Sequence, residues 1–221
     1  MLAPVWRLPK DEIVRLAKQR CKHGHTYLEH YNCYETEQQD PEKIGFIDIE
    51  ASNLKANFGI MLSYCIKERE TEKIWFDVIT KKDMESDILD RRIVKHCIED
   101  MIRFDRVIGH YSTKYDIPFI RTRALSLGLS FPEFGQLNHT DVYYMARRLL
   151  CLSSNRQGVI AETLTGEDIK TRIDSKHWIP ALQGKKEALD YILDHNKRDV
   201  LQLEKNYEIL RVFTKNIKKS I

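Results

Sequence analysis

Three strand-length apolar segments between residues 44 and 80 constrain the fold more than any other feature of the chain. They read IGFIDIE from residue 44, FGIMLSYCI from residue 58 and KIWFDVIT from residue 73. All three are rich in the β-branched and aromatic residues that favour strands. Because the connections between them are short, we expect neighbouring strands to pair antiparallel. The sequence therefore predicts a sheet that begins with three antiparallel strands.

The rest of the chain alternates helical and strand-like patterns. Apolar residues recur at helical spacing over residues 84–105, which predicts a helix of about six turns. We expect the later elements in this order: a strand at RVIGH (106–110), a helix over 117–127, a short strand within LNHTDVYYMA (137–146), a helix through Arg148, and helices around 158–165 and 186–213. Strand–helix units that follow an antiparallel start indicate an α/β domain, in which a mixed β-sheet is flanked by helices.

The first 42 residues differ in character from this domain. Residues 10–20 suit a short amphipathic helix, and residues 35–43 read as a polar linker. Between them, residues 21–34 contain two cysteines, three histidines and three tyrosines. We therefore expect two parts: an N-terminal helix with a small metal-binding segment over 1–42, and the main domain over 43–221.

The cysteines and histidines of this segment could bind a structural zinc ion. A tetrahedral site needs four ligands, and the sequence offers Cys21, His25, His30 and Cys33, with His23 as an alternative to His25. Zinc binding can supply the folding free energy that so polar a segment lacks. A histidine-rich loop with two free thiols is the open alternative. With zinc bound, the segment could contact nucleic acid or protein.

Composition excludes some classes of protein but does not identify the function. Thirty-six basic against 33 acidic residues give a net charge of +3, which permits a polyanionic partner without requiring one. The five cysteines are odd in number, which indicates a reducing compartment. The sequence has no apolar run of the ~18 residues that a membrane span needs. We expect a soluble, cytoplasmic protein that is neither secreted nor bound to a membrane.

Three acidic positions could form a site together. Asp48 and Glu50 end the first predicted strand, and residues two apart in a strand point to the same face. A divalent cation between the two carboxylates would offset their repulsion. Asp116 precedes a predicted helix, and Asp199 lies within one. Each also has a simpler interpretation: a solvated strand end, a helix N-cap and a surface acid, respectively.

Taken in order, the motifs DIE, GHYSTKYDIPF and HNKRDV resemble those of the DEDD 3′–5′ exonucleases of the ribonuclease H-like superfamily. The resemblance covers roughly residues 43–213 and is closest to the proofreading domains of family B DNA polymerases and to the YprB-like proteins. It implies a ribonuclease H-like fold and an enzyme that hydrolyses phosphodiester bonds, removing nucleotides from the 3′ end of DNA or RNA. A structure-selective endonuclease and a catalytically inactive nucleic-acid-binding module are the alternatives.

The resemblance also implies roles for individual residues. Two Mg²⁺ or Mn²⁺ ions would be held by four carboxylates, those of Asp48, Glu50, Asp116 and Asp199. A single-stranded 3′ end would be the ligand, with replication or repair proteins as possible further partners. Contacts to the strand are expected at Ala51, Asn53, Leu54 and Tyr111. Leu54 would wedge against the last bases, unless it is a core leucine, and Tyr111 stands where many relatives have asparagine. Asp141 matches a further acidic position of the family or caps a helix.

His195 departs from both subtypes of this family. Relatives carry, before the last aspartate, either a tyrosine with three residues between or a histidine with four. Here a histidine has the tyrosine spacing, four positions before Asp199. Residues four apart on a helix share a face, so His195 can reach a water held over Asp199. It would accept a proton from that water or position it, and the simpler alternative is a surface pair with Asp199 or Asp194.

Overall fold

The computed structural model describes residues 8–21, 23–38, 42–166 and 174–214. The chain divides into two compact units, Met1–Glu42 and Lys43–Ile221, and each unit is described by itself.

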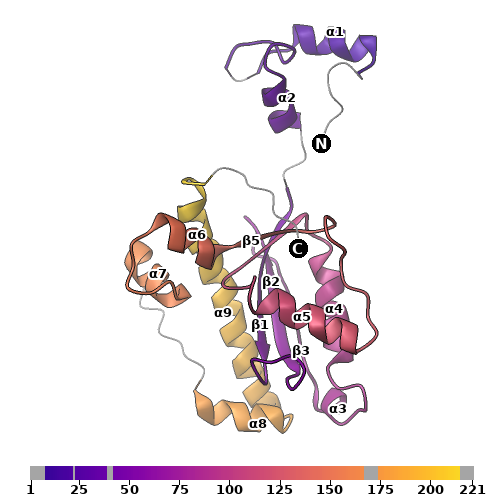
Figure 1. Cartoon of the computed structure of the whole chain (residues 1–221), viewed down its shortest axis with the longest axis vertical. Helices are drawn as coiled ribbons and strands as arrows, with labels where there is room; N and C mark the ends of the chain where they lie inside the picture. The colour runs from indigo at the N-terminus through magenta and orange to yellow at the C-terminus, as the bar shows by residue number, and fades with distance from the viewer. Residues whose placement is uncertain (1–7, 22, 39–41, 167–173, 215–221) are drawn as a thin grey trace. The chain divides into compact units, whose positions relative to one another are not determined.

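A five-stranded mixed sheet forms the centre of the larger unit (Figure 1). Its spatial order is β3-β2-β1-β4-β5. The strands are β1 (Ile44–Ala51), β2 (Met61–Glu68), β3 (Ile74–Val78), β4 (Arg106–Gly109) and β5 (Asn138–Asp141). Strand β1 pairs antiparallel with β2 and parallel with β4, so the predicted antiparallel start and the mixed sheet are both confirmed.

Helices cover both faces of this sheet, as expected for the α/β class. They are α3 (Lys81–Met84), α4 (Arg91–Met101), α5 (Asp116–Ser126), α6 (Val142–Leu149), α7 (Gln157–Thr165), a 3-10 turn (Ser175–His177), α8 (Trp178–Leu182) and α9 (Lys186–Arg211). Helices α4 and α5 lie on one side of the strands in Figure 1 and the long helix α9 runs along the other. Within the described residues, no helix combines the length and the apolar character needed to cross a membrane.

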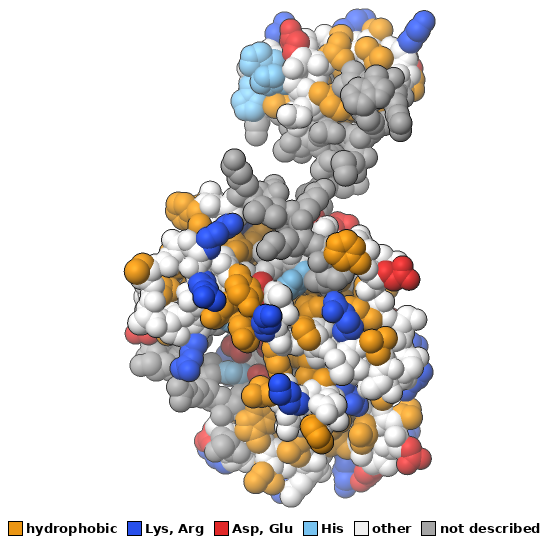
Figure 2. Space-filling view, viewed as in Figure 1, with side chains coloured by type: hydrophobic (Ala, Val, Ile, Leu, Met, Phe, Trp, Pro, Cys, Tyr) orange, Lys and Arg blue, Asp and Glu red, His pale blue; other side chains and the backbone are white. Residues whose placement is uncertain are grey.

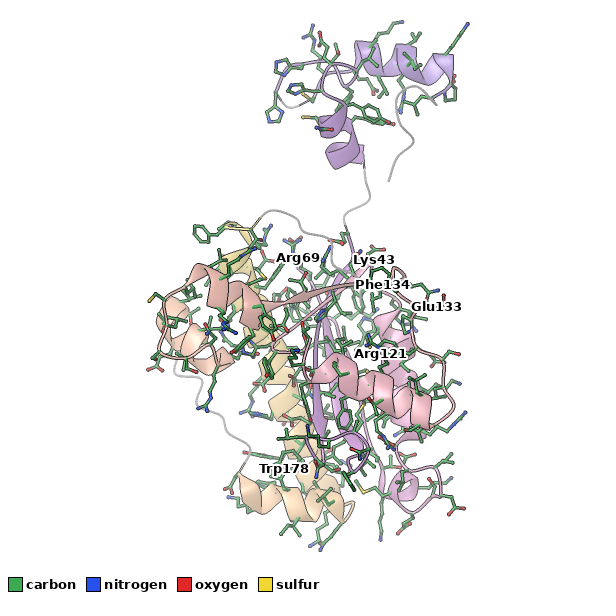
Figure 3. All side chains as sticks on the ribbon, in the orientation of Figure 1. Lys43, Arg69, Arg121, Glu133, Phe134 and Trp178 are labelled. Carbon is green, nitrogen blue, oxygen red and sulfur yellow. The ribbon has the colours of Figure 1, made fainter. Side chains whose placement is uncertain are left out.

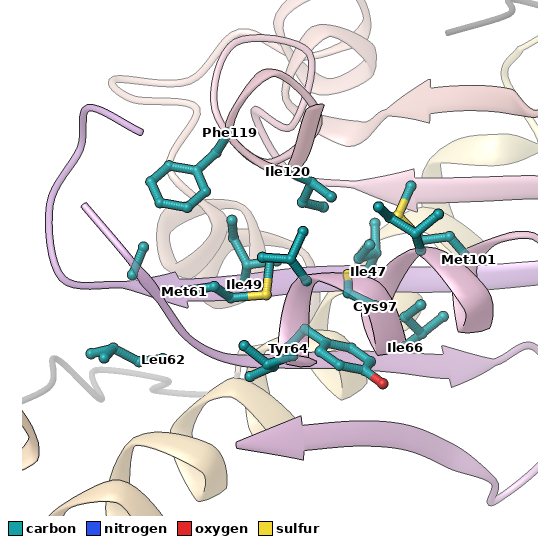
Figure 4. Close-up of a cluster of buried hydrophobic side chains, with 14 of the residues drawn as sticks. Ile47, Ile49, Met61, Leu62, Tyr64, Ile66, Cys97, Met101, Phe119 and Ile120 are labelled. Carbon is teal, nitrogen blue, oxygen red and sulfur yellow. The ribbon is translucent and has the colours of Figure 1, made fainter. Parts of the chain in front are cut away.

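The alternation of side chains along β1 divides the core into two layers. Ile47 and Ile49 point to the α4 and α5 side, where they pack with Cys97 and Ile120 (Figure 4). Phe46 points to the opposite side and packs with α9. Because successive side chains in a strand point to opposite faces, Asp48 and Glu50 share the face of Phe46. The same pattern that buries the isoleucines therefore directs both carboxylates toward α9.

The helix expected over residues 84–105 is much shorter than predicted. Helix α4 has 11 residues and begins only at Arg91. Leu89, with φ of 42°, has left-handed backbone, which ends helical geometry just before it. Asp90 is fully buried and accepts a hydrogen bond from Met61 N (2.8 Å). These tertiary contacts outweigh the helical periodicity of the sequence.

The small unit contains two helices joined by residues 19–30, in which Arg20 and Thr26 form an antiparallel bridge. Helix α1 (Lys10–Lys18) matches the prediction, whereas α2 (Tyr31–Gln38) extends into the segment expected to be a linker. Glutamate and glutamine are good helix formers, which accounts for this extension. The buried residues that hold the unit together are Leu16, Cys21, Tyr27 and Tyr34. So small an apolar cluster contributes little stability by itself.

Candidate active site

The carboxylates of β1 lie where the strand ends its regular pairing. Asp48 pairs in register with Cys65, and the register shifts between Glu50 and Ala51. Such irregularities are frequent beside active sites because they redirect side chains at a sheet edge. The shift leaves Glu50 at the last regular position of β1, on the same face as Asp48.

Asp116 joins the first turn of α5 to β1. Its carboxylate is buried and its Oδ1 accepts a hydrogen bond from Ile49 N (3.1 Å). The simpler interpretation, a helix N-cap, is wrong: Asp116 is the first residue of the helix, and Tyr115 is the cap. The hydrogen bond places the Asp116 carboxylate beside the backbone that connects Asp48 to Glu50.

Helix α9 brings His195 and Asp199 to the same place. The Nε2 atom of His195 lies 3.4 Å from Asp199 Oδ2 and 3.9 Å from Glu50 Oε1. One ligand atom from each of these three residues lies within 4.8 Å of the others. The His195 side chain is only 12% exposed, so the pair is not on the open surface.

Polar contacts along α9 fix the position of this pair. From α7, Gln157 Nε2 donates to the main-chain oxygen of Asp199 (2.8 Å). Asn196 is fully buried, and its Nδ2 donates to Ser63 Oγ on β2 (3.4 Å). Gln157 and Asn196 hold this part of α9 in place, and the sequence analysis assigned a role to neither. The only signal for Asn196 in the sequence was its place next to His195, and Gln157 had none.

Burial and mutual repulsion raise the pKa values of the two β1 carboxyl groups. The pKa of Asp48 lies well above its ordinary value because of burial and then because of Asp116, Asp199 and Glu50. Burial, Asp199 and Asp116 raise the pKa of Glu50 to about 8. The charges of Asp116 and Asp199 thus act on both β1 carboxyl groups, which places the four groups in one electrostatic cluster.

The other two carboxyl groups shift in the same direction. Burial raises the pKa of Asp116 to about 7, although its backbone hydrogen bonds, including that from Ile49, lower it. Burial also raises the pKa of Asp199 to about 7, against the opposing effect of Arg198. Among the described residues, none of the four carboxylates forms an ion pair with lysine or arginine; only His195 is paired, with Glu50 and Asp199. Within the described residues the four carboxylates thus have no lysine or arginine partner, and their oxygen donors are those that Mg²⁺ and Mn²⁺ prefer.

The loop after Glu50 presents apolar side chains to solvent. Leu54 is 78% exposed, which excludes the alternative of a core leucine, whereas Ala51 is buried. Asn53 accepts a hydrogen bond from Lys55 N through its side chain (2.9 Å). Phe58 is 81% exposed, although it was assigned to the second strand from the sequence.

Arg123 of α5 anchors this loop to the helix that carries Asp116. Its Nη1 donates to Ala56 O (3.3 Å), and its guanidinium pairs with the buried carboxylate of Asp90. Arg123 thus connects the loop that carries Leu54 and Phe58 to the buried Asp90.

The loop that leads to Asp116 is held by Asp141. Oxygens of its carboxylate accept hydrogen bonds from Tyr111 N and Thr113 N, both at 2.9 Å. The same side chain accepts a hydrogen bond from Tyr143 N and so caps α6. A helix cap is one of the two alternatives that the sequence offered for Asp141. Tyr111 has left-handed backbone (φ 60°) and is 44% exposed.

A second cluster of candidate metal ligands lies in the small unit. One atom from each of Cys21, His23, His30 and Cys33 lies within 4.8 Å of the others. The sulfur of Cys33 is 3.3 Å from His23 Nδ1 and 3.7 Å from His30 Nδ1, and that of Cys21 is 3.9 Å from His23 Nδ1. Neighbouring S and N ligands of a tetrahedral zinc are ~3.6 Å apart, so these distances fit one ion.

His23, the stated alternative, takes the place expected for His25 in this cluster. Gly24 has φ of 85°, and the turn is closed by a hydrogen bond from Cys21 N to His25 O (2.8 Å). This turn directs His23 to the two sulfurs. His25 instead packs against the ring of His30, tilted by 38°, with ring centroids 4.2 Å apart.

Comparison with known proteins agrees with the fold. A family model described as the RNase H superfamily matches residues 45–211, and the chain belongs to this superfamily. Membership supports nuclease activity on nucleic acid with divalent metal ions. No curated protein sequence matches the chain.

A solved structure shares the fold at low sequence identity. The family B DNA polymerase from the hyperthermophilic archaeon Pyrobaculum calidifontis is similar with a TM-score of 0.62 and 15% identity. The similarity covers 79% of this chain and 25% of the polymerase, so the chain spans about a quarter of the polymerase's length.

Proposed function

We propose that the protein is a metal-dependent 3′–5′ exonuclease that removes single nucleotides from a single strand of DNA or RNA. The observation that carries this proposal is the group of four carboxyl groups with raised pKa values, from strand β1 and the two helices α5 and α9, beside one histidine. The group lies in a fold whose superfamily supports nuclease activity.

Asp48, Glu50, Asp116 and Asp199 are the residues that would hold two Mg²⁺ or Mn²⁺ ions. Their oxygens suit hard divalent cations, and three pKa values near 7 to 8 mean that the cluster retains protons at neutral pH unless a cation balances it. When bound, two such ions supply the Lewis acidity that stabilises the attacking and leaving oxygens of a phosphodiester.

His195 suits the role of proton acceptor. Burial, and then Arg198, lower its pKa, which favours the neutral imidazole at pH 7. A neutral imidazole can accept the proton of the water that attacks the phosphorus. Its Nε2 lies 3.4 Å from Asp199, so the two side chains could hold that water between them. The surface-pair alternative is less favoured, because His195 also lies near Glu50.

The loop after Glu50 supports cleavage at a strand end. Leu54 and Phe58 are exposed apolar side chains within ten residues of the carboxylates, where they can contact unpaired terminal bases. Arg123 restrains the loop through Ala56 O. The choice of the 3′ end rests on the resemblance of the motifs to DEDD exonucleases.

Strands with blocked ends test the polarity and the mode of cleavage. Labelled single-stranded DNA and RNA, blocked at either end or circular, would be incubated with the full chain and Mg²⁺ or Mn²⁺. We expect a 3′ block and a circle to prevent degradation and a 5′ block to leave it unaffected. Cleavage of circles would indicate an endonuclease, and binding without any degradation in Mn²⁺ would indicate an inactive module.

We also propose that Cys21, His23, His30 and Cys33 hold one structural zinc ion. The donor set of two thiols and two imidazoles is typical of zinc, and its interatomic distances fit a tetrahedron. Bound zinc would join the turn after α1 to the start of α2 and so supplement the small apolar cluster of this unit.

A further inference from the structure

Three tyrosines form a continuous aromatic surface in the larger unit. The ring of Tyr111 is nearly parallel to that of Tyr144, at 27°, with centroids 6.5 Å apart. Tyr143 stands edge-on to both, 4.9 Å from Tyr111 and 5.1 Å from Tyr144. The two near-parallel faces are thus supported by a third ring.

The topology places this aromatic surface at the same end of the sheet as the carboxylates. Tyr111 lies in the loop between β4 and Asp116, and Tyr143 and Tyr144 begin α6 directly after β5. Strands β1, β4 and β5 are parallel, so their carboxyl ends meet at one edge. Asp141 joins the two parts of the surface, since it binds the main chain of Tyr111 and of Tyr143.

The conformation of Tyr111 is not explained by stability. Left-handed backbone costs a tyrosine ~1 kcal/mol, and glycine or asparagine would adopt it more easily. The ring remains 44% exposed, so burial recovers only part of this cost. A strained residue that is held firmly and presents an aromatic face to solvent indicates a binding role.

Positive charge accompanies the aromatic surface. Arg147 and Arg148 lie four positions after Tyr143 and Tyr144 on α6, and residues four apart share a helix face. Both arginines are exposed, and neither forms an ion pair within the part of the chain that the structure describes. Figure 2 shows Lys and Arg side chains around a hollow of the larger unit in which acidic and histidine side chains are visible.

We propose that Tyr111, Tyr143 and Tyr144, with Arg147 and Arg148, bind the single strand of nucleic acid that leads to the candidate active site. Unpaired bases stack on the rings, and phosphates pair with the guanidinium groups. The bases of a duplex are already stacked on one another, so the surface selects single strands. The proposal rests on the proposed function, since it makes this strand the substrate of the nuclease.

Strand affinity of the full chain tests the proposal. Fluorescence anisotropy would measure binding of a labelled 12-nucleotide single strand, of DNA or of RNA, and of the matching duplex, without Mg²⁺ or Mn²⁺ so that nothing is cut. We expect Tyr111→Gly and Tyr144→Ala each to weaken single-strand binding ~10-fold. Tyr111→Gly removes the ring and relieves the backbone, and Tyr111→Phe, which keeps the ring, should bind like the wild type.

Phe134→Ala is the matched control. Phe134 is 86% exposed and lies, with Lys43, at the end of the sheet where β1 begins (Figure 3). This variant should bind like the wild type. The double variant Arg147→Gln, Arg148→Gln should reduce the slope of log affinity against log salt by ~1.4, as expected for two lost phosphate contacts on a single strand.

Two results would overturn the proposal. They are wild-type affinity in both ring-deleting variants with their thermal unfolding unchanged, and a wild-type protein that binds duplex at least as tightly as single strand. These outcomes differ from failure of the proposed function. If the chain binds single strands through the tyrosines but never cleaves them, the proposed binding surface stands and the proposed nuclease activity fails. If it cleaves single strands but the ring-deleting variants bind them like the wild type, the nuclease activity stands and the proposed binding surface fails.

Discussion

The two candidate metal-binding clusters of this protein differ in how they relate to the core around them. The Cys/His cluster lies in a unit whose buried core, among the residues described there, consists of Leu16, Cys21, Tyr27 and Tyr34. The carboxylate cluster lies at the edge of a large two-layered core, with β1 at its centre. In the first region, a metal would supply stability that the core lacks. In the second, the core supplies the stability that holds four carboxylates together against their repulsion.

The largest expected effect is the loss of stability on removing one ligand of the proposed zinc site. Because zinc binding to such a site carries ~10 to 16 kcal/mol of apparent free energy, Cys21→Ser should unfold the small unit. His25→Asn is the matched control, since His25 lies outside the four-residue group. Metal analysis should find one zinc per chain in the wild type and in His25→Asn and none in Cys21→Ser. Equal zinc loss in both variants would contradict the assignment of His23.

In the second region, His195 should be needed for chemistry and not for the fold. We expect His195→Ala to reduce the rate of strand hydrolysis by ~100-fold or more with the melting temperature little changed. His195→Gln should keep the position of the side chain but remove the base. Its activity should therefore be low at all pH values, without the rise with pH that deprotonation of an imidazole produces. An active glutamine variant with a wild-type pH profile would show that His195 positions water instead.

The cost in stability of holding the carboxylates together can be measured from the pH dependence of the free energy of unfolding. Folded-state pKa values of about 7 to 8 lie above the unfolded values near 4, so the folded protein binds more protons between these limits. The carboxylates should therefore lower stability as pH rises from about 4.5 to 8, by a few kcal/mol in order of magnitude, while His110, whose pKa burial lowers to about 4, opposes this effect between about pH 4 and 6.5. Asp83, whose pKa is lowered to about 2, changes stability only below this window.

Urea unfolding at pH 5 and pH 8 would test this dependence. The protein should be dialysed free of Mg²⁺ and Mn²⁺ without a chelator, so that zinc remains. We expect Asp48→Asn to be more stable than the wild type at pH 8 and to differ less from it at pH 5. Added Mg²⁺ should stabilise the wild type more than the variant. A wild type that gains stability from pH 5 to pH 8 would contradict the electrostatic account of the cluster.

The smallest expected effect concerns the exposed loop that follows Glu50. Phe58→Ala should lower kcat/KM on a single strand by ~10-fold through loss of base contact, with no loss of stability, because the side chain is exposed. Phe134→Ala removes an equally exposed phenylalanine and should leave kcat/KM unchanged. Equal effects of the two substitutions would exclude a specific role for Phe58.

The sequence predicted best those features that depend on local periodicity. Alternation along β1 placed Ile47 and Ile49 in the core, and the same alternation predicted that Asp48 and Glu50 share a face. The sequence motifs predicted that Asp116 and Asp199 would join Asp48 and Glu50 in one site. In the structure, the charges of Asp116 and Asp199 raise the pKa of Asp48.

Features that depend on tertiary contacts or on unusual backbone were missed. Leu89 and the buried Asp90 interrupt the long helix expected from periodicity, since no local pattern reveals the pairing of Asp90 with Arg123. The turn at Gly24 selects His23 over His25 by its positive φ, which spacing alone does not specify. Phe58 was read as the start of a strand because it adjoins apolar residues, whereas β2 begins at Met61.

The central claim is that the carboxylate cluster is the hydrolytic centre of a 3′–5′ exonuclease. Its most direct test is the release of the terminal nucleotide from a 3′-labelled single strand in Mn²⁺ by the wild type and by Asp48→Asn and Asp199→Asn. We predict release by the wild type and a loss of at least ~1,000-fold in both variants, with folding retained. Release at the wild-type rate by both variants would contradict the claim.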